Sequence, residues 1–427
     1  MNITLLPVEL LLGIFVRASE DTEDDKGAKT VFRLAGVCRD WRVLLLDYPR
    51  AWSTVSFAHP VATELMLQRS RTEPITIHLD LRGRLHPETE HRTSMARHTL
   101  ERAHARTRRL TVIVDKDTPR NSARQILSNL SRPAAALETI EFLIANPFGS
   151  QRATFSIAPH NLAQLSLLKK LSLHDTLLNT VSCSLAEHCT SLVHLDLRTA
   201  RGLSLSALLA ILTGAQKTLE TLKLDRFESP LKSGDTPVEP IYLPVLRELF
   251  LGLDSPISPR SHVAILEYIT YPSTAHLAIH IHVWADALRA LSSQAMLKTY
   301  LLGRGYQFRS ILLDSIPSGL RLRYRLEREP PDLDNLGAQP AALLDLSIAG
   351  SCIHVVTDVL VSLADAANLA NVERAVIKPL NERILWARLL VHTPKLTELS
   401  VYGSHNIRNL RFARRALIDS GTDNKSV

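Results

Sequence analysis

Histidine and cysteine side chains occur in two stretches where they could ligate a metal ion. Cys183 and Cys189 flank a histidine, and His276, His280 and His282 lie close together, the last two on one face if the stretch is a strand. Structural zinc sites use paired Cys-x-x-Cys spacing, which the first stretch lacks, and the second run contains no Cys, Asp or Glu. We therefore expect no metal site, and we expect Cys189 to be a small buried residue.

Catalytic signatures are missing from the sequence. It contains no Gly-x-Ser-x-Gly elbow, no P-loop and no complete Gly-x-Gly-x-x-Gly fingerprint. The segment 302–306 has two glycines at the spacing of a fragment only and is predicted to be a loop. Because no nucleophile and base can be paired, a hydrolase on an α/β scaffold is disfavoured. We expect no catalytic residue and no cofactor.

An arginine-rich stretch could form a basic face for nucleic acid or for an acidic target. Its arginines are Arg92, Arg97, Arg102, Arg106, Arg108 and Arg109. Alanine, threonine, Leu100 and Glu101 interleave with them, which favours an amphipathic helix between two strands with a solvated basic side. The net charge of +7 over 427 residues is modest, and basic and acidic residues are mostly interleaved. We therefore expect no nucleic-acid partner.

Composition predicts a folded chain of two or three units. The chain is 45% hydrophobic but only 5% aromatic, so its apolar mass comes from aliphatic residues.

Four scattered cysteines favour a reducing compartment. The first sixteen residues carry no basic residue, and Pro7 and Glu9 interrupt them, so we expect no signal peptide. No charge-free apolar run approaches the ~20 residues of a membrane helix. We expect a soluble protein, cytoplasmic and/or nuclear, without a membrane partner.

The first sixty residues predict three short helices. The pairs Leu10/Ile14 and Leu11/Phe15 are spaced four residues apart, so a first helix ending near residue 18 carries a wide apolar stripe. An acidic segment, 19–27, is predicted to be a loop, followed by a helix from about residue 30 and another from about residue 40. So small a unit cannot bury this many apolar side chains by itself. The excess is expected to face a partner.

Three motifs in this segment resemble the F-box family. Residues 6–15 read Leu-Pro-Val-Glu-Leu-Leu-Leu-Gly-Ile-Phe, residues 37–42 read Val-Cys-Arg-Asp-Trp-Arg, and Trp52 fills the closing tryptophan. Their order and spacing match the F-box pattern. Two departures are the acidic loop, which replaces a shorter turn, and Ala51, where the family usually has leucine.

The resemblance implies that the segment binds a Skp-family adaptor, which links F-box proteins to a cullin ubiquitin ligase. The positions that match the family's adaptor contacts, together with the neighbouring apolar positions, are Leu6, Pro7, Leu10, Leu11, Ile14, Phe15, Leu34, Val37, Cys38, Trp41 and Trp52. Ile14 and Phe15 are expected to be central anchors.

Further along the chain, the phrase Leu-x-x-Leu-x-Leu recurs. In four clear copies the last leucines are Leu173, Leu197, Leu224 and Leu251, at steps of 24, 27 and 27 residues. Looser copies end at Phe142, Ile279 and Val401, and strand-like alternation occurs at 75–79 and 110–114. Segments 311–313, 344–346 and 375–377 are further candidates. Segments 206–215 and 263–270 are predicted to be helices, and 228–240 and 327–340 loops.

These copies resemble leucine-rich repeats, whose period is ~20–29 residues. The resemblance implies an α/β fold in which an N-terminal three-helix F-box precedes an irregular leucine-rich-repeat solenoid. Parallel strands would line the concave face, and helices or loops the convex face. The predicted organisation is an F-box domain at 1–60, connecting or first repeat-like units at 61–136, a repeat domain at 137–415 and a disordered tail at 416–427.

If the leucines point inward, their neighbours line the concave sheet. These neighbours are Lys170, Ser172, His174, His194, Asp196, Arg198, Thr221, Lys223, Asp225, Glu248 and Phe250. They carry charges of both signs and one aromatic ring, which suits a polypeptide target better than a phosphate backbone.

Together the resemblances to the F-box family and to leucine-rich repeats imply the substrate-recognition subunit of an SCF-type E3 ubiquitin ligase. Its adaptor would bind the F-box and its unidentified polypeptide target the repeat domain. The chain has neither a recognisable reactive thiol nor a RING-type metal array, so catalysis would reside in partners. The alternative is an F-box and repeat scaffold that mediates protein–protein interaction outside any ligase.

Overall fold

The computed structural model divides the chain into two compact units, Met1–Leu219 and Glu220–Val427. The residues it describes are 6–19, 26–57, 59–82, 86–115, 118, 126, 136–144, 155–156, 165–174, 176–177, 189–198, 203–225, 240–253, 265–266, 268–272, 275–283, 310–316, 319–325, 344–350, 374–377 and 398–401. The predicted tail at 416–427, the loop at 327–340 and nearly all of the loop at 228–240 lie outside these ranges. No helix in the described part of the chain is long and apolar enough to cross a membrane.

Helices occupy the three N-terminal segments where apolar spacing predicts them. They are α1 (Val8–Ser19), α2 (Lys26–Ala35) and α3 (Arg39–Leu46), followed by a 3-10 turn, η3 (Pro49–Trp52). The carbonyl of Pro7 accepts the first hydrogen bond of α1, from Leu11, and the Cys38 sulfur caps α3 by accepting from the Trp41 amide at 3.5 Å. The second helix starts at Lys26, inside the segment expected to be a loop.

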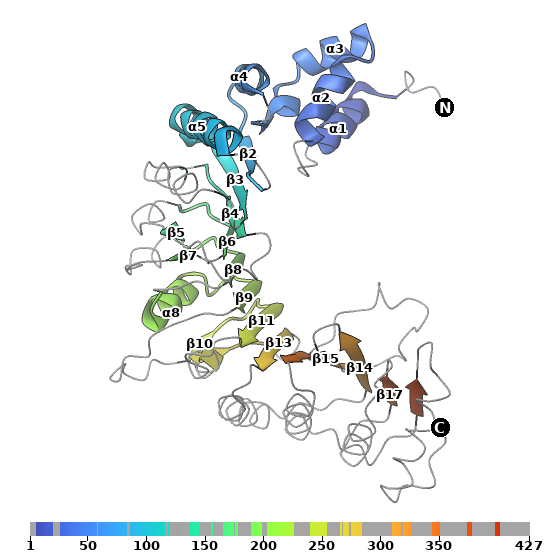
Figure 1. The fold of residues 1–427 in the computed structure, drawn as a ribbon, viewed down its shortest axis with the longest axis vertical. Coiled ribbons are helices and arrows are strands. Elements are labelled where there is room, and N and C mark those ends of the chain that lie inside the picture. The colour runs from blue at the N-terminus through green and yellow to red at the C-terminus, as the bar shows by residue number, and fades with distance from the viewer. Residues whose placement is uncertain are drawn as a thin grey trace, which may run out of the picture. The chain divides into compact units, whose positions relative to one another are not determined.

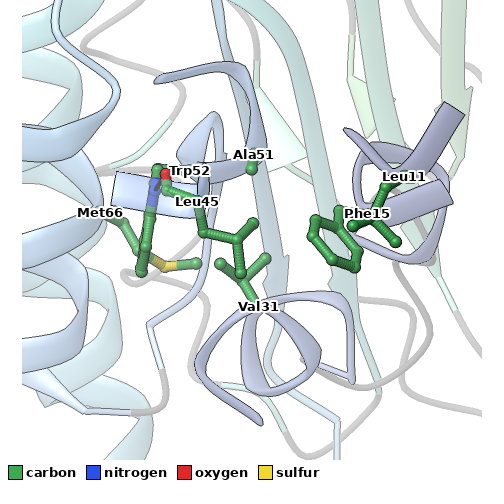
Figure 2. Close-up of a cluster of buried hydrophobic side chains, with 7 residues drawn as sticks. All are labelled: Leu11, Phe15, Val31, Leu45, Ala51, Trp52 and Met66. Carbon is green, nitrogen blue, oxygen red and sulfur yellow. Dashed lines mark hydrogen bonds between the residues drawn. The ribbon is translucent and has the colours of Figure 1, made fainter. Parts of the chain in front are cut away.

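One hydrophobic core joins these helices to the next one along the chain, α4 (Pro60–Arg69). Its buried members, drawn in Figure 2, are Leu11, Phe15, Val31, Leu45, Ala51, Trp52 and Met66. Trp52 is fully buried, its Nε1 donates to the Leu45 carbonyl at 2.7 Å, and the Arg69 guanidinium lies 4.4 Å from the centre of its ring. Since Met66 belongs to α4, the helices and the segment that begins the sheet share one core.

In the first unit, parallel strands lie side by side, and a helix forms each of the first two crossovers (Figure 1). The sheet order is β1 (Thr54–Val55), β2 (Ile75–Asp80), β3 (Thr107–Val114), β4 (Thr139–Ile144), β6 (Lys170–His174) and β8 (His194–Arg198). Helix α4 connects β1 to β2, and α5 (His86–Ala103) with the turn η4 (His104–Arg106) connects β2 to β3. Helix α8 (Leu205–Gly214) follows β8, where a helix was predicted. Two short strands, β5 (Phe155–Ser156) and β7 (Thr176–Leu177), pair in parallel separately.

The register of these strands stacks apolar residues in two rows across five strands. The rows are Ile77–Leu110–Ile140–Leu171–Leu195 and Leu79–Val112–Phe142–Leu173–Leu197. Every member is at most 1% exposed. The leucines of the recurring phrase in this unit therefore form the core of a parallel sheet, as their spacing predicts.

In the second unit, the sheet is parallel at both ends and antiparallel between them. Its order is β9 (Thr221–Asp225), β11 (Glu248–Leu253), β13 (His276–Val283), β16 (Leu344–Gly350), β15 (Gly319–Arg325), β14 (Ser310–Ile316), β17 (Arg374–Ile377) and β18 (Glu398–Val401). Strand β15 pairs antiparallel with both neighbours. A separate parallel pair joins β10 (Ile241–Tyr242) and β12 (Ile269–Thr270).

Two sequence predictions fail in this unit. The expectation of parallel strands alone overlooked β15, in which leucine and tyrosine alternate with arginine at period two. Only two residues, 317 and 318, separate β15 from β14, a length that suits an antiparallel hairpin. The helix predicted at 263–270 is also wrong at its end, because Ile269–Thr270 form β12. The chain is an α/β protein with a parallel sheet, and its described strands close no barrel.

The arginine-rich stretch is divided among several elements. Arg92 is buried in α5, with its Nε 3.3 Å from Glu88 Oε1, and Arg108 and Arg109 belong to β3 rather than to a helix. Arg106 donates to the Leu67 carbonyl at 3.1 Å and the Ser70 hydroxyl at 3.0 Å, at the end of α4. It therefore satisfies groups that a helix end leaves unpaired. These arginines therefore do not form a single basic face on one helix.

We predict that Trp52→Ala lowers the free energy of unfolding by about 3–5 kcal/mol, because it leaves a cavity in the core that joins α1–α4. Chemical denaturation of the full chain, followed by circular dichroism, measures the change. The matched control is Val61→Ala on α4, where the side chain is exposed and the expected change is within about 0.5 kcal/mol. Equal effects of the two substitutions would contradict the central position of Trp52.

Candidate interaction surfaces

Helix α1 carries apolar side chains on two neighbouring faces, one buried and one exposed. Leu11 and Phe15 are 6% and 1% exposed and belong to the core, whereas Leu10 and Ile14 are 57% and 51% exposed. The helix of a globular protein normally places polar residues on its outer face. At Gly13, which is exposed, an added Cβ would meet no atom of the described residues within 4 Å.

The structure separates the residues predicted to contact an adaptor into three groups. Pro7, Leu10, Ile14, Val37 and Cys38 are exposed. Leu6, Leu34 and Trp41 are partly buried. The remaining three, Leu11, Phe15 and Trp52, are buried. The expectation that Phe15 anchors a partner therefore needs correction: its ring packs inside, with its centre 4.8 Å from that of Trp41.

Further exposed apolar residues lie on the same helical unit. Val8, Val43 and Leu46 are exposed and were not predicted to be part of the site. We call the exposed set the helical surface, which comprises Val8, Leu10, Ile14, Val37, Val43 and Leu46. These are six of the ten large hydrophobic residues that are exposed in the described part of the chain. Exposed apolar side chains are therefore concentrated on the N-terminal helices.

The polar face of the first sheet is the second candidate. Its residues alternate with the apolar rows, and we call the set on β2–β8 the polar sheet face. Three rows cross the strands in register. The first row is Thr76–Arg109–Thr139–Lys170–His194, and the second is His78–Thr111–Glu141–Ser172–Asp196. The third consists of Asp80–Ile113–Leu143 on β2–β4 and His174–Arg198 on β6 and β8. Arg82 follows Asp80. The predicted residues Lys170, Ser172, His174, His194, Asp196 and Arg198 all lie here, although Ser172 is only 3% exposed.

A repeated pentapeptide builds two arginine–aspartate pairs on this face. The sequence His-Leu-Asp-Leu-Arg occurs at 78–82 and again at 194–198. Arg198 Nε donates to Asp196 Oδ1 at 3.0 Å and its Nη2 to Oδ2 at 3.0 Å. Arg82 binds Asp80 in the same two-pronged way, at 3.0 and 2.6 Å. Sequence reasoning missed the first pair, and the repeated pentapeptide was the signal that could have found it.

Longer-range pairs connect neighbouring strands. Glu141 accepts from the Thr111 hydroxyl at 2.8 Å and forms an ion pair with Lys170. At the start of the strands, Glu138 lies 3.2 Å from both Arg108 Nε and Lys169 Nζ. Opposite charges across adjacent strands are favourable, whereas like charges there would destabilise the sheet.

The carboxylates of this face are held in their ionised form. Burial alone would raise the pKa of Asp196, but its hydrogen bonds and the charge of Arg198, with nearby His174, lower the pKa below its usual value. The pKa of Asp80 is lowered in the same way against its burial by Arg82, and the pKa of Glu141 by Lys170 and Thr111. His174 Nε2 is 3.7 Å from Asp196 Oδ2, beyond hydrogen-bond distance, and this buried atom has no hydrogen-bond partner among the described residues.

In the second unit, the predicted concave residues are partly buried, and one ion pair joins two of them. Thr221, Lys223, Asp225, Glu248 and Phe250 are neither fully buried nor exposed. Lys223 Nζ lies 3.0 Å from Glu248 Oε1. At Gly252, opposite Asp225 on the next strand, any side chain would overlap the Asp225 carboxylate. The Asp225 carboxylate occupies the space that a side chain at position 252 would need.

The cysteines and histidines considered as metal ligands lie in different parts of the chain. Cys189 is buried as predicted, and burial raises the pKa of its thiol to about 12, which keeps it protonated and unreactive. The described ranges contain no group of three His, Cys, Asp or Glu side chains that could hold a metal ion. His276, His280 and His282 lie in β13, and Cys183 lies outside the described residues. No protein-family model and no curated protein matches the chain.

We predict that Asp196→Asn lowers the free energy of unfolding at pH 7 by about 1–3 kcal/mol, because it weakens the charged pair with Arg198. The pKa of Asp196 is lower in the folded than in the unfolded chain, so its stabilisation is complete above the unfolded pKa of ~3.9. It disappears as the pH falls through the folded pKa.

Denaturation curves of parent and variant at pH 7 and over the range below ~4 test this, since the difference between them should shrink with acid. Glu101→Gln on α5, an exposed carboxylate 3.8 Å from Arg97, is the control and should change stability by less than about 1 kcal/mol. A difference that grows on acidification would contradict the assignment.

Proposed function

We propose that this chain is the substrate-recognition subunit of an SCF-type E3 ubiquitin ligase. Its N-terminal helices would act as an F-box that binds a Skp-family adaptor and, through it, a cullin ligase. The rest would be a leucine-rich-repeat-like domain that presents a polypeptide target. The proposal assigns no catalytic residue or cofactor to the chain and places it in the cytoplasm and/or nucleus.

The observation that carries the proposal is the exposed outer face of α1. Leu10 and Ile14 lie within the motif that resembles an F-box, and both remain more than half exposed after the helical core has formed. Burying a leucine or isoleucine removes apolar area from water and is worth ~1.5–3 kcal/mol. Two such residues on one helix face are suited to fill a groove on a partner.

The buried residues of the same motif support this division of roles. Phe15, Trp52 and Leu11 hold the helices in the arrangement that leaves Leu10 and Ile14 outside. A substitution at a core position would therefore abolish adaptor binding by unfolding the unit. Only substitutions on the helical surface can separate docking from folding.

We predict that the double variant Leu10→Ser/Ile14→Ser binds a Skp-family adaptor at least about thirtyfold more weakly than the parent, since anchor residues typically contribute ≥ ~2 kcal/mol. Co-purification, followed by titration with the purified adaptor, measures the loss. The variant should unfold at the parent's denaturant concentration, because neither side chain belongs to the core.

The control for this experiment is Leu167→Ser, another exposed leucine that lies outside the helical unit and should leave adaptor binding unchanged. A folded double variant that binds as tightly as the parent would show that the helical surface is not the docking site. If the parent itself does not bind, the receptor function is refuted.

An experiment in cells then distinguishes the ligase function from the scaffold function. When the docking-deficient variant replaces the parent, proteins that co-purify with both forms should rise in abundance if the chain is a ligase receptor. Quantitative proteomics measures the change, with Leu167→Ser as control. Unchanged abundance of those proteins would favour the interaction scaffold.

A further inference from the structure

The charged residues of the polar sheet face are layered by sign. Where Arg82 pairs with Asp80, the side chains are 43% and 7% exposed, and where Lys170 pairs with Glu141 they are 43% and 18% exposed. The pair of Arg198 with Asp196 repeats the pattern at 44% and 17%. In each of these three pairs the arginine or lysine is more exposed than the carboxylate.

The same layering holds at the start of the strands and on β3. Glu138 is 24% exposed, whereas its partners Arg108 and Lys169 are 53% and 54% exposed. Arg109, beside Glu141 in charge interaction, is also exposed. The accessible charge of the face is therefore positive, although charges of both signs occur on it. This refines the sequence-based view of a face with mixed charge.

Apolar side chains lie between the two arginine–aspartate pairs. In the third row, Ile113 and Leu143 are partly exposed and lie on β3 and β4, between the β2 pair and the β8 pair. Four strand spacings of ~4.8 Å separate β2 from β8, which is about 19 Å. An extended segment of about six residues covers that distance at ~3.3 Å per residue.

We propose that the polar sheet face binds an anionic segment of a polypeptide, in extended form, with acidic groups at both ends and apolar residues between them. The acidic ends contact Arg82 and Arg198, and the apolar centre lies over Ile113 and Leu143. This rests on the proposed function in treating the segment as the recognition element of the target.

A nucleic acid fits the face less well. Asp196 and Glu141 remain partly accessible among the cations. A nucleic-acid strand carries one negative charge every 3.4 Å and would pass over these carboxylates. A polypeptide can place neutral residues there, and it can bury side chains against Ile113 and Leu143.

The test is binding of a fluorescein-labelled eight-residue peptide to the full chain, measured by fluorescence anisotropy at ~0.1 M salt. The peptide has two glutamates at each end and Leu-Ser-Leu-Ser between them. A second peptide replaces the glutamates with glutamines, and a third replaces them with phosphoserines, which distinguishes carboxylate from phosphate as the source of charge. A 12-base-pair DNA duplex serves as the nucleic-acid probe.

We expect the glutamine peptide to bind at least about tenfold more weakly than the better of the two anionic peptides. Arg198→Gln and Arg82→Gln should each weaken the anionic peptide about three- to fivefold, and the double variant about tenfold or more. Ile113→Thr, under the apolar centre, should also weaken it and leaves both arginine–aspartate pairs intact, so it keeps the test valid if an arginine variant proves unstable. Arg102→Gln on α5, half exposed and paired with Glu64 at 2.8 Å, is the matched control and should have little effect.

Equal binding of the glutamine peptide, or equal loss in Arg102→Gln, would overturn the proposal, because attraction would then be unspecific. Tighter binding of the duplex, lost in the same variants, would make the face a nucleic-acid surface and overturn it too. Peptide binding is measured without the adaptor, and adaptor binding without the peptide. Failure here therefore leaves the docking result of the helical surface unaffected.

Discussion

The constant register of the parallel strands is the constraint on which the first unit depends. Because β2, β3, β4, β6 and β8 align position by position, alternate residues fall into rows on opposite faces. A slip of one residue on β6 would expose Leu171 and Leu173 and turn Lys170 and Ser172 toward the core. Each misplaced leucine costs ~1.5–3 kcal/mol, and a buried unpaired lysine costs more. The same register therefore determines both which side chains form the core and which line the polar face.

The layering of charge on the outer face follows from side-chain length. Aspartate is short and stays near the sheet, whereas arginine and lysine have long stems that lie across their neighbours and keep the charged group in water. Asp196 beneath Arg198 and Asp80 beneath Arg82 show this at both edges of the face. Replacing both partners of such a pair by apolar residues of similar volume would change stability little, because desolvation offsets attraction, whereas changing one partner alone is destabilising. Their clearer effect is positional, since each aspartate fixes the direction of an exposed guanidinium.

Sequence patterns predicted the features that recur on every strand well, and they predicted features that occur once, such as the exposed face of α1, poorly. The leucine spacing placed Leu173 and Leu197 in the core, because burial on every strand imposes the same period. It could not decide the outer face of α1, since Leu10/Ile14 and Leu11/Phe15 have identical spacing and only tertiary packing selects one pair. Neighbouring strands likewise determine which partner of an ion pair is more exposed, as for Lys170, which is more exposed than Glu141. The antiparallel hairpin of β14 and β15 was missed because a repeat pattern predicts that every strand is connected to the next as a parallel neighbour.

The two surfaces of the first unit suit different kinds of binding. The helical surface offers aliphatic side chains, so burial of area would drive association there and salt would change it little. The polar sheet face offers cations above ionised carboxylates, so its attraction would weaken as salt screens it. Leu10 is 57% exposed, a Cβ added at Gly13 would meet no atom of the described residues within 4 Å, and glycine within a helix costs about 1 kcal/mol relative to alanine. If a partner covers this face, as proposed, burial of Leu10 would offset that cost, and the polar sheet face would stay available for a second partner.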